Sequence, residues 1–116
     1  MKRTVELPIR TVSEANQREH WGKKAARAKK QRKATATLLL AKFGKAVPRV
    51  RPPDCITLTR IAPRSLDSDN LAGSFKAIRD GIQDWCGVND RDLVFVYAQR
   101  RGKPGEYAVE IAMEWT

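Results

Sequence analysis

The stretch "SLDSDNLAGSFKAIRDGIQDWCGVNDRD", residues 65–92, decides how this chain is expected to fold. Large apolar side chains recur in it every three or four residues, which at about 100° per residue places them in one stripe of a helix. The stripe consists of Leu71, Phe75, Ile78, Ile82 and Trp85, and Gly87 follows where a helix would end. The spacing therefore predicts one continuous helix over residues 69–86 that packs its apolar stripe on the core.

The segments around this helix have the composition and alternation of β-strands. They are "RTVELPIRTV" (3–12), "DCITLTRIA" (54–62), "DLVFVYAQRR" (92–101) and "EYAVEIAMEW" (106–115). The last alternates apolar and polar or small residues throughout, which predicts a strand with one buried face. In the third, residues 93–98 are nearly all apolar, which predicts a strand buried on both faces.

A second helix is predicted near the N-terminus, over residues 13–43. Ser13 suits its N-cap, Gly44 its C-terminal cap, and Pro48 prevents continuation, although Gly22 could delay its start. The resulting order is β-α-β-α-β-β. This order predicts an α+β fold in a single domain, residues 1–116, with two helices packed on one face of a mixed sheet.

The charge of the chain points to a polyanionic partner. Lys and Arg number 23 against 13 Asp and Glu, which gives a net charge of +10. Such a balance favours nucleic acid, although acidic membranes and ribosomal neighbours also attract small basic proteins. No apolar run is long enough to span a membrane and no signal peptide precedes the first strand, so we expect a cytoplasmic protein. No glycine-rich phosphate loop is present, so no nucleotide cofactor is expected.

Two carboxylates, Asp67 and Asp69, stand at the expected start of the 69–86 helix. Either they cap the helix and favour its dipole, or they hold a cation between them, since two anions that close repel each other. Mg²⁺ is the natural cation because it prefers oxygen ligands. Asp90 or Asp92, after the same helix, could complete such a site.

Lys76 falls on the helical face that carries Asp69, opposite the apolar stripe, if residues 69–86 form one helix. Its ammonium group would then meet a phosphate held near Asp69. The alternative is a solvated ion pair with Asp80, one helical turn later. Asp84 and Asp92 are expected to be solvated.

These segments resemble the RusA family of Holliday junction resolvases. "LDSDNL" is similar to the family's D-x-D-N-L motif, "KAIRDGI" to its lysine-bearing turn, and "GVNDRDLV" to its acidic pair before a strand. "REHWGKKAARAKKQR" is similar to the His-Trp and basic residues of phage-type members. Two departures stand out: Lys76 lies three residues later than in the best-known members, and Asn89 replaces the first acid of the pair.

The resemblance implies a Mg²⁺-dependent endonuclease that cuts Holliday junctions and related branched DNA, in DNA recombination and repair of a bacterium or its phage. It implies Asp67, Asp69 and Asp90 as metal ligands, Lys76 as the fourth catalytic residue, and a homodimer, because a junction is cut at two symmetric positions. The competing hypothesis is a non-catalytic, basic nucleic-acid-binding protein with a degenerate metal site.

Cations dense enough to follow a DNA backbone lie on the first predicted helix. Lys23, Arg27 and Lys30 share a face at i, i+4 and i+7. With Lys24 and with Arg64, just before the acids, they are the predicted DNA-binding residues. His20, the only histidine, has no evident acidic partner, so a DNA contact or packing beside Trp21 is preferred to general-base catalysis.

Overall fold

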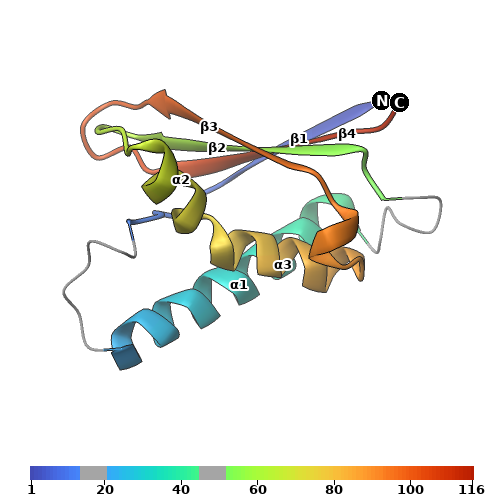
Figure 1. Ribbon diagram of the computed structural model, residues 1–116, viewed down its shortest axis with the longest axis horizontal. Helices are drawn as coiled ribbons and strands as arrows, with labels where there is room; N and C mark the ends of the chain where they lie inside the picture. The colour runs from blue at the N-terminus through green and yellow to red at the C-terminus, as the bar shows by residue number, and fades with distance from the viewer. Residues whose placement is uncertain (14–20, 45–51) are drawn as a thin grey trace.

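The computed structural model describes residues 1–13, 21–44 and 52–116, in which helices cover one face of a four-stranded sheet (Figure 1). In chain order the elements are β1 (Lys2–Leu7), α1 (Trp21–Phe43), β2 (Cys55–Ala62), α2 (Ser68–Ser74), α3 (Lys76–Cys86), the 3-10 helix η3 (Asp90–Asp92), β3 (Phe95–Arg101) and β4 (Ala108–Glu114). Among the described residues, no helix is both long enough and apolar enough to cross a membrane.

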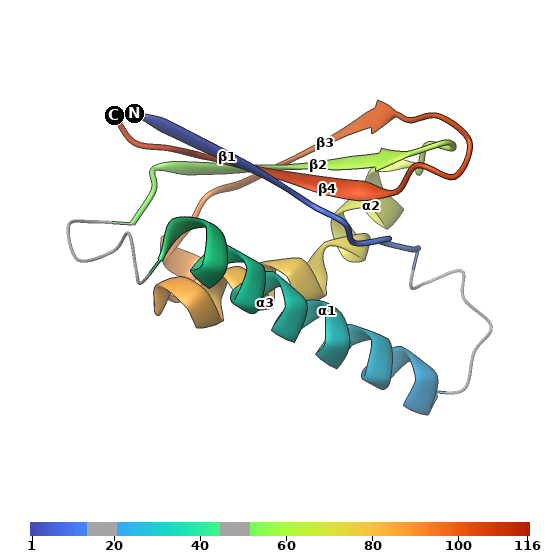
Figure 2. The same ribbon diagram turned by 180° about the vertical axis from the view of Figure 1, so that it is seen from behind.

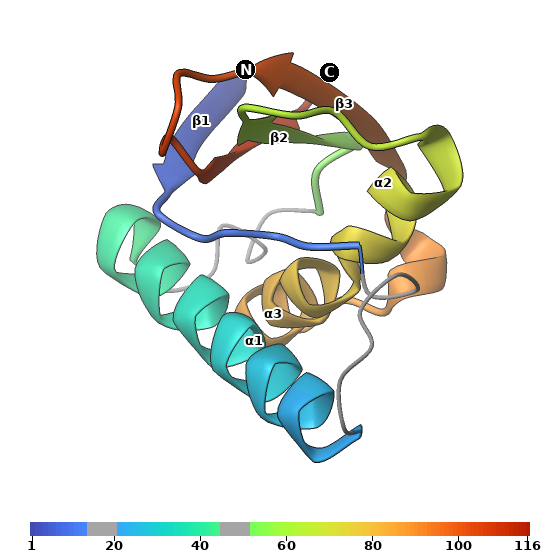
Figure 3. The ribbon, with the colours of Figure 1, turned by 90° about the vertical axis from the view of Figure 1, so that its left-hand side faces the viewer.

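The sheet is mixed, as predicted, with the strand order β1-β4-β2-β3. β4 pairs antiparallel with β1 and β2, whereas β2 and β3 are parallel. A parallel pair needs a crossover connection, and α2 and α3 supply it. Figures 2 and 3 show α1, α2 and α3 on the same side of the sheet. The predicted α+β architecture is therefore confirmed, with three α-helices in the described residues where two were predicted.

The predicted helix over residues 69–86 is in fact two helices that meet at Phe75. Phe75 has φ −95° and ψ 2°, and its N–H donates to the carbonyl of Ala72 at 3.2 Å. Its ring is fully buried and stacks on Tyr97, with centroids 5.7 Å apart. The turn at Phe75 lets α2 and α3 run in different directions under the sheet (Figure 3). The prediction of one helix was wrong because spacing within the chain does not show a change of axis.

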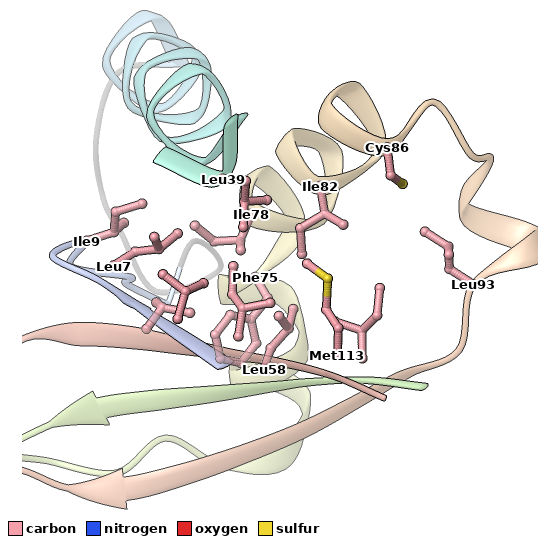
Figure 4. Packing of buried hydrophobic residues seen from close by; sticks show 14 of the residues in the cluster. Leu7, Ile9, Leu39, Leu58, Phe75, Ile78, Ile82, Cys86, Leu93 and Met113 are labelled. Carbon is pink, nitrogen blue, oxygen red and sulfur yellow. The ribbon is translucent and has the colours of Figure 1, made fainter. Parts of the chain in front are cut away.

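The apolar stripe nevertheless faces the core. Leu71, Phe75, Ile78 and Ile82 are buried, and Trp85 is half-buried at the edge of the core. In Figure 4, Phe75, Ile78 and Ile82 lie among residues of the sheet and of α1, including Leu58, Met113 and Leu39. Apolar burial of this kind is the main stabilising contribution to the fold.

The third predicted strand is not buried on both faces. β3 lies at the edge of the sheet, where Val94 is 58% exposed and Val96 45% exposed. Tyr97, on the other face of the strand, packs against Phe75. The apolar run predicted a strand buried on both faces, but its position at the edge of the sheet leaves the face away from the helices open.

The first predicted helix is described from Trp21 to Phe43. Gly44 ends it, as predicted, with a positive φ of 73° and an N–H that donates to the carbonyl of Leu40 at 2.8 Å. Residues 14–20, which include His20, and residues 45–51, which include Pro48, lie outside the described residues. α1 packs along α3 below the sheet (Figure 2).

Candidate nucleic-acid and metal site

The acid motif, Asp67 and Asp69, follows the C-terminal end of β2, where the chain turns into α2. Asp67 is the N-cap: its carboxylate accepts hydrogen bonds from the backbone N–H of Asn70 at 3.0 Å and from Asn70 Nδ2 at 3.1 Å. Asp69 lies in the first turn of α2, and both acids are exposed. An ionised carboxylate can accept about four hydrogen bonds or metal contacts, so capping leaves Asp67 able to bind a cation.

Asp90 lies at the other end of the parallel strand pair. The register joins Ile56 to Phe95 at the start of β2 and β3, and Ala62 to Arg101 at their ends. Six residue steps at about 3.3 Å each separate the two ends by about 20 Å. η3, which Asp90 opens, precedes β3, whereas Asp67 and Asp69 follow β2, and Figure 1 shows α2 and η3 well apart.

Within one chain, the backbone of Asp90 is therefore not next to Asp67 and Asp69. The side chain of Asp90 is outside the described part of the structure. Within that part, no three His, Cys, Asp or Glu side chains are close enough together to hold a metal ion. Asp67 and Asp69 supply the carboxylate oxygens that Mg²⁺ prefers, so these two residues fit a magnesium site that needs further ligands.

Lys76 is exposed and pairs with Asp80, with Nζ 3.5 Å from the carboxylate. The alternative that the sequence left open, an ion pair one turn along, is therefore present. Lys76 was expected to share a face with Asp69 only if residues 69–86 formed one helix. The turn at Phe75 interrupts that helix. Lys76 instead lines a groove between α1 and the α2–α3 pair, and Asp69 is not among the residues that line it.

This helix groove encloses about 490 Å³ and has cations on both walls. Lys24 and Lys29 contribute from α1, and Lys76 from α3, with Gly73 between them on the α2 side. Of the predicted DNA-binding residues on α1, only Lys24 lines it. The other three, Lys23, Arg27 and Lys30, lie on another side of the helix, where Lys23 and Lys30 are exposed and Arg27 is half-buried.

Asp84 is not merely solvated, as the sequence suggested. It accepts two hydrogen bonds from Arg32 of α1, at 2.6 Å from Nε and 2.8 Å from Nη2. This bidentate pair joins α1 to α3, and the hydrogen bond from Arg32 lowers the pKa of the Asp84 carboxyl. Arg32, in the Lys- and Arg-rich part of α1, therefore has a structural role. The predicted partner of Lys76, Asp80, and the exposure of Asp92 are both confirmed.

A second cavity, the arginine pocket, lies where β2 and β3 end. Arg60, Arg64, Arg100 and Arg101 line it together with Ser65 and Gln99, around about 420 Å³. The sequence singled out only Arg64 of these arginines. The signal for Arg60 was available, since it occupies an inward position of "CITLTRIA", where the alternation would place an apolar residue.

Gln99 connects the arginine pocket to the acid motif. Its side chain accepts a hydrogen bond from the N–H of Leu66 at 2.9 Å and donates one to the carbonyl of Leu66 at 2.7 Å. Leu66 directly precedes Asp67, so the end of β3 fixes the segment that carries the acids. Cations and carboxylates therefore lie side by side on one short stretch of backbone.

Comparison with models of known protein families finds no match, and comparison with curated proteins finds no significant one. The resemblance to RusA resolvases rests on the motifs in the sequence.

Proposed function

We propose that the protein is a Mg²⁺-dependent endonuclease that hydrolyses phosphodiesters of branched DNA, including four-way junctions. One observation carries the proposal: the exposed Asp67 and Asp69 follow, within a few residues, the segment Arg64–Ser65 that lines an arginine-rich cavity, on a protein of net charge +10. Carboxylates suit a hydrolytic metal ion, and arginines suit the phosphates on either side of the cut. The motifs similar to the RusA family support the same assignment.

In this proposal Asp67 and Asp69 hold the metal ion. When bound, Mg²⁺ would neutralise charge on the scissile phosphate and lower the pKa of a water. Lys76, exposed on the helix groove, would offset negative charge on the phosphate oxygens or the leaving group, which requires it to exchange Asp80 for the phosphate. Lys24 lies on the same groove, while Lys23, Arg27 and Lys30 would bind flanking phosphates.

A homodimer gives Asp90 a place in the proposed site. Since the length of β3 separates Asp90 from Asp67 within one chain, it would act on the metal ion held by a second subunit. The same arrangement would give two active sites related by a two-fold axis, which suits symmetric cutting of a junction.

The test is cleavage of a synthetic four-way junction by wild type and by Asp69→Asn, with Mg²⁺ and with EDTA. We expect wild type to cut only with Mg²⁺ and Asp69→Asn to lose at least about 100-fold in rate, since even the hydrogen-bonding partners of metal ligands typically contribute about 10- to 100-fold. Glu6→Gln, which removes one negative charge from exposed β1, is the matched control and should cut normally. Equal cutting by wild type and Asp69→Asn would refute the site.

A second candidate is a nucleic-acid-binding protein without catalysis. Two contacts favour it: Asp67 already serves as an N-cap, and Lys76 is already paired with Asp80. If no variant cuts under any condition while wild type and Asp69→Asn bind the junction equally at low salt, the binding function is the correct one.

A further inference from the structure

We propose that the arginine pocket binds a backbone phosphate of a nucleic-acid strand, with the buried Arg60 as its central donor. This inference deepens the proposed function, on which it rests for the place of the strand relative to the acids. Phosphate binding itself is independent of cleavage and is measured separately.

Arg60 occupies a position that ordinarily holds an apolar side chain. It alternates along β2 with Ile56 and Leu58, which are fully buried on the face toward the helices. The register places Val109 of β4 and Gln99 of β3 on either side of it. Arg60 is only 8% exposed. A charged side chain so deep in the sheet is rare unless it is paired.

Among the described residues, no carboxylate compensates this charge. Arg60 Nη1 donates to the carbonyl of Arg64 at 2.6 Å, but Nε is buried without a hydrogen-bond partner among the described residues. No carboxylate of the described residues pairs with it, and Arg10 adds a second cation nearby. Burial, and then Arg10, lower the pKa of Arg60, yet a guanidinium stays protonated in proteins. A buried donor and an uncompensated charge are costly until an anion supplies the acceptor.

The lining of the pocket fits a phosphate. Arg64, Arg100 and Arg101 are exposed at its rim, Ser65 and Gln99 add neutral polar groups, and none of the acidic side chains that the structure describes lines it. Guanidinium groups match the geometry of phosphate oxygens, which they bind with two parallel hydrogen bonds. The cavity of about 420 Å³ also leaves room for the sugars that a phosphodiester carries.

A nucleic-acid strand is the source of the bound phosphate group that fits the rest of the molecule. Ser65, which lines the pocket, stands two residues before Asp67, and Gln99, which also lines it, is hydrogen-bonded to the backbone of Leu66, so a strand held in the pocket lies near the segment that carries the acids. The cationic helix groove provides further phosphate positions along the molecule. A net charge of +10 favours a polyanion over a single free ion, because each neutralised phosphate releases counterions.

The experiment measures binding of a fluorescein-labelled 12-nucleotide DNA single strand and of its duplex by anisotropy, in EDTA so that no cleavage occurs. Arg60→Met should weaken binding at least about 10-fold, since it removes the charged hydrogen bonds to the phosphate, and should lower the salt slope by about one phosphate contact. Arg60→Lys keeps the charge without the planar fork and should lie between. Arg3→Met removes an exposed arginine of β1, on the other edge of the sheet, and is the matched control.

Two further arms cover folding and the source of the phosphate. Arg101→Gln, an exposed rim variant, should fold normally and weaken strand binding about 3-fold or more, so the test survives if Arg60→Met does not fold. Inorganic phosphate at constant ionic strength should raise the Tm of wild type more than that of Arg60→Met.

Strand binding by Arg60→Met equal to that of Arg3→Met would overturn the proposal. Tight inorganic phosphate binding without Arg60-dependent strand binding would overturn the assignment to a strand. Loss of cleavage alone, with these results intact, would refute only the proposed nuclease.

Discussion

Arg32 on the helical side of the molecule and Arg60 at the end of β2 are the same residue type in opposite circumstances. Arg32 is half-exposed and has a bidentate carboxylate partner in Asp84, whose hydrogen bond raises the pKa of the guanidinium. Arg60 is buried, with only the carbonyl of Arg64 and no carboxylate among the described residues. The guanidinium of Arg32 therefore has its anionic partner within the protein. Arg60 instead has a buried N–H donor, Nε, to which no described residue offers an acceptor.

The two regions also differ in packing. α1 and α3 approach each other closely at Gly81, where an added Cβ would lie 2.6 Å from the carbonyl oxygen of Arg32 and 2.7 Å from Thr35 Cβ. The arginine pocket instead encloses about 420 Å³. We therefore expect substitutions in the helical region to change stability, and substitutions in the arginine pocket to change binding.

The largest effect is expected from Phe75→Ala. The ring is fully buried at the junction of α2 and α3 and stacks on Tyr97, so its removal should cost about 3–5 kcal/mol of the free energy of unfolding. Urea unfolding followed by circular dichroism measures this loss. Phe43→Ala is the matched control at the edge of the core, where the ring is half-buried, and should cost less. Equal losses for both would contradict the central place of Phe75.

Gly81→Ala should destabilise the protein by about 1–3 kcal/mol, because the added methyl group meets backbone and the Thr35 side chain. Gly73→Ala is the matched control in α2, since nothing lies within 4 Å of its added Cβ. It should stabilise the protein by up to about 1 kcal/mol through helix propensity. Thermal unfolding of both variants measures the contrast, and a stabilised Gly81→Ala would mean that α1 and α3 are not packed this closely.

Arg60→Met should leave the free energy of unfolding unchanged in chloride buffer, or raise it by about 1–2 kcal/mol, because a buried donor without an acceptor is removed. The sign is opposite to that expected for Phe75→Ala and Gly81→Ala. Arg101→Met, at the exposed rim, should change stability by less than about 0.5 kcal/mol. A large loss on Arg60→Met in the same chloride buffer, without phosphate or nucleic acid, would show that Arg60 is a structural residue.

The smallest effect is expected from Asp84→Asn, at most about 1 kcal/mol, since the pair with Arg32 is half-exposed. Because Arg32 lowers the folded pKa of Asp84, the stabilisation is present above the unfolded carboxyl pKa of about 3.9. It is lost as the pH falls through the lower folded value. The difference in Tm between wild type and Asp84→Asn should therefore vanish in acid, while Asp92→Asn, at an exposed residue, should differ little at any pH.

The sequence by itself determined which side chains of residues 69–86 face the core. The stripe from Leu71 to Ile82 is buried although its helix breaks in the middle, because hydrophobic burial depends on which side chains face the sheet and tolerates a turn between them. The alternation in 106–115 and the cap at Gly44 were likewise readable, since both are local properties of the chain. The same is true of the position of Asp67 at a helix start.

Only the tertiary structure decided which charged residues far apart in the sequence meet. The turn at Phe75 places Lys76 on the helix groove, and the parallel pairing of β2 and β3 sets Asp90 at the opposite end from Asp67. The pairing of Arg32 with Asp84 joins residues 52 positions apart. Arg60 and Arg101 reach one pocket because neighbouring strands end together. Local spacing fixes the faces of helices and strands, whereas contacts between distant charges depend on how those elements pack.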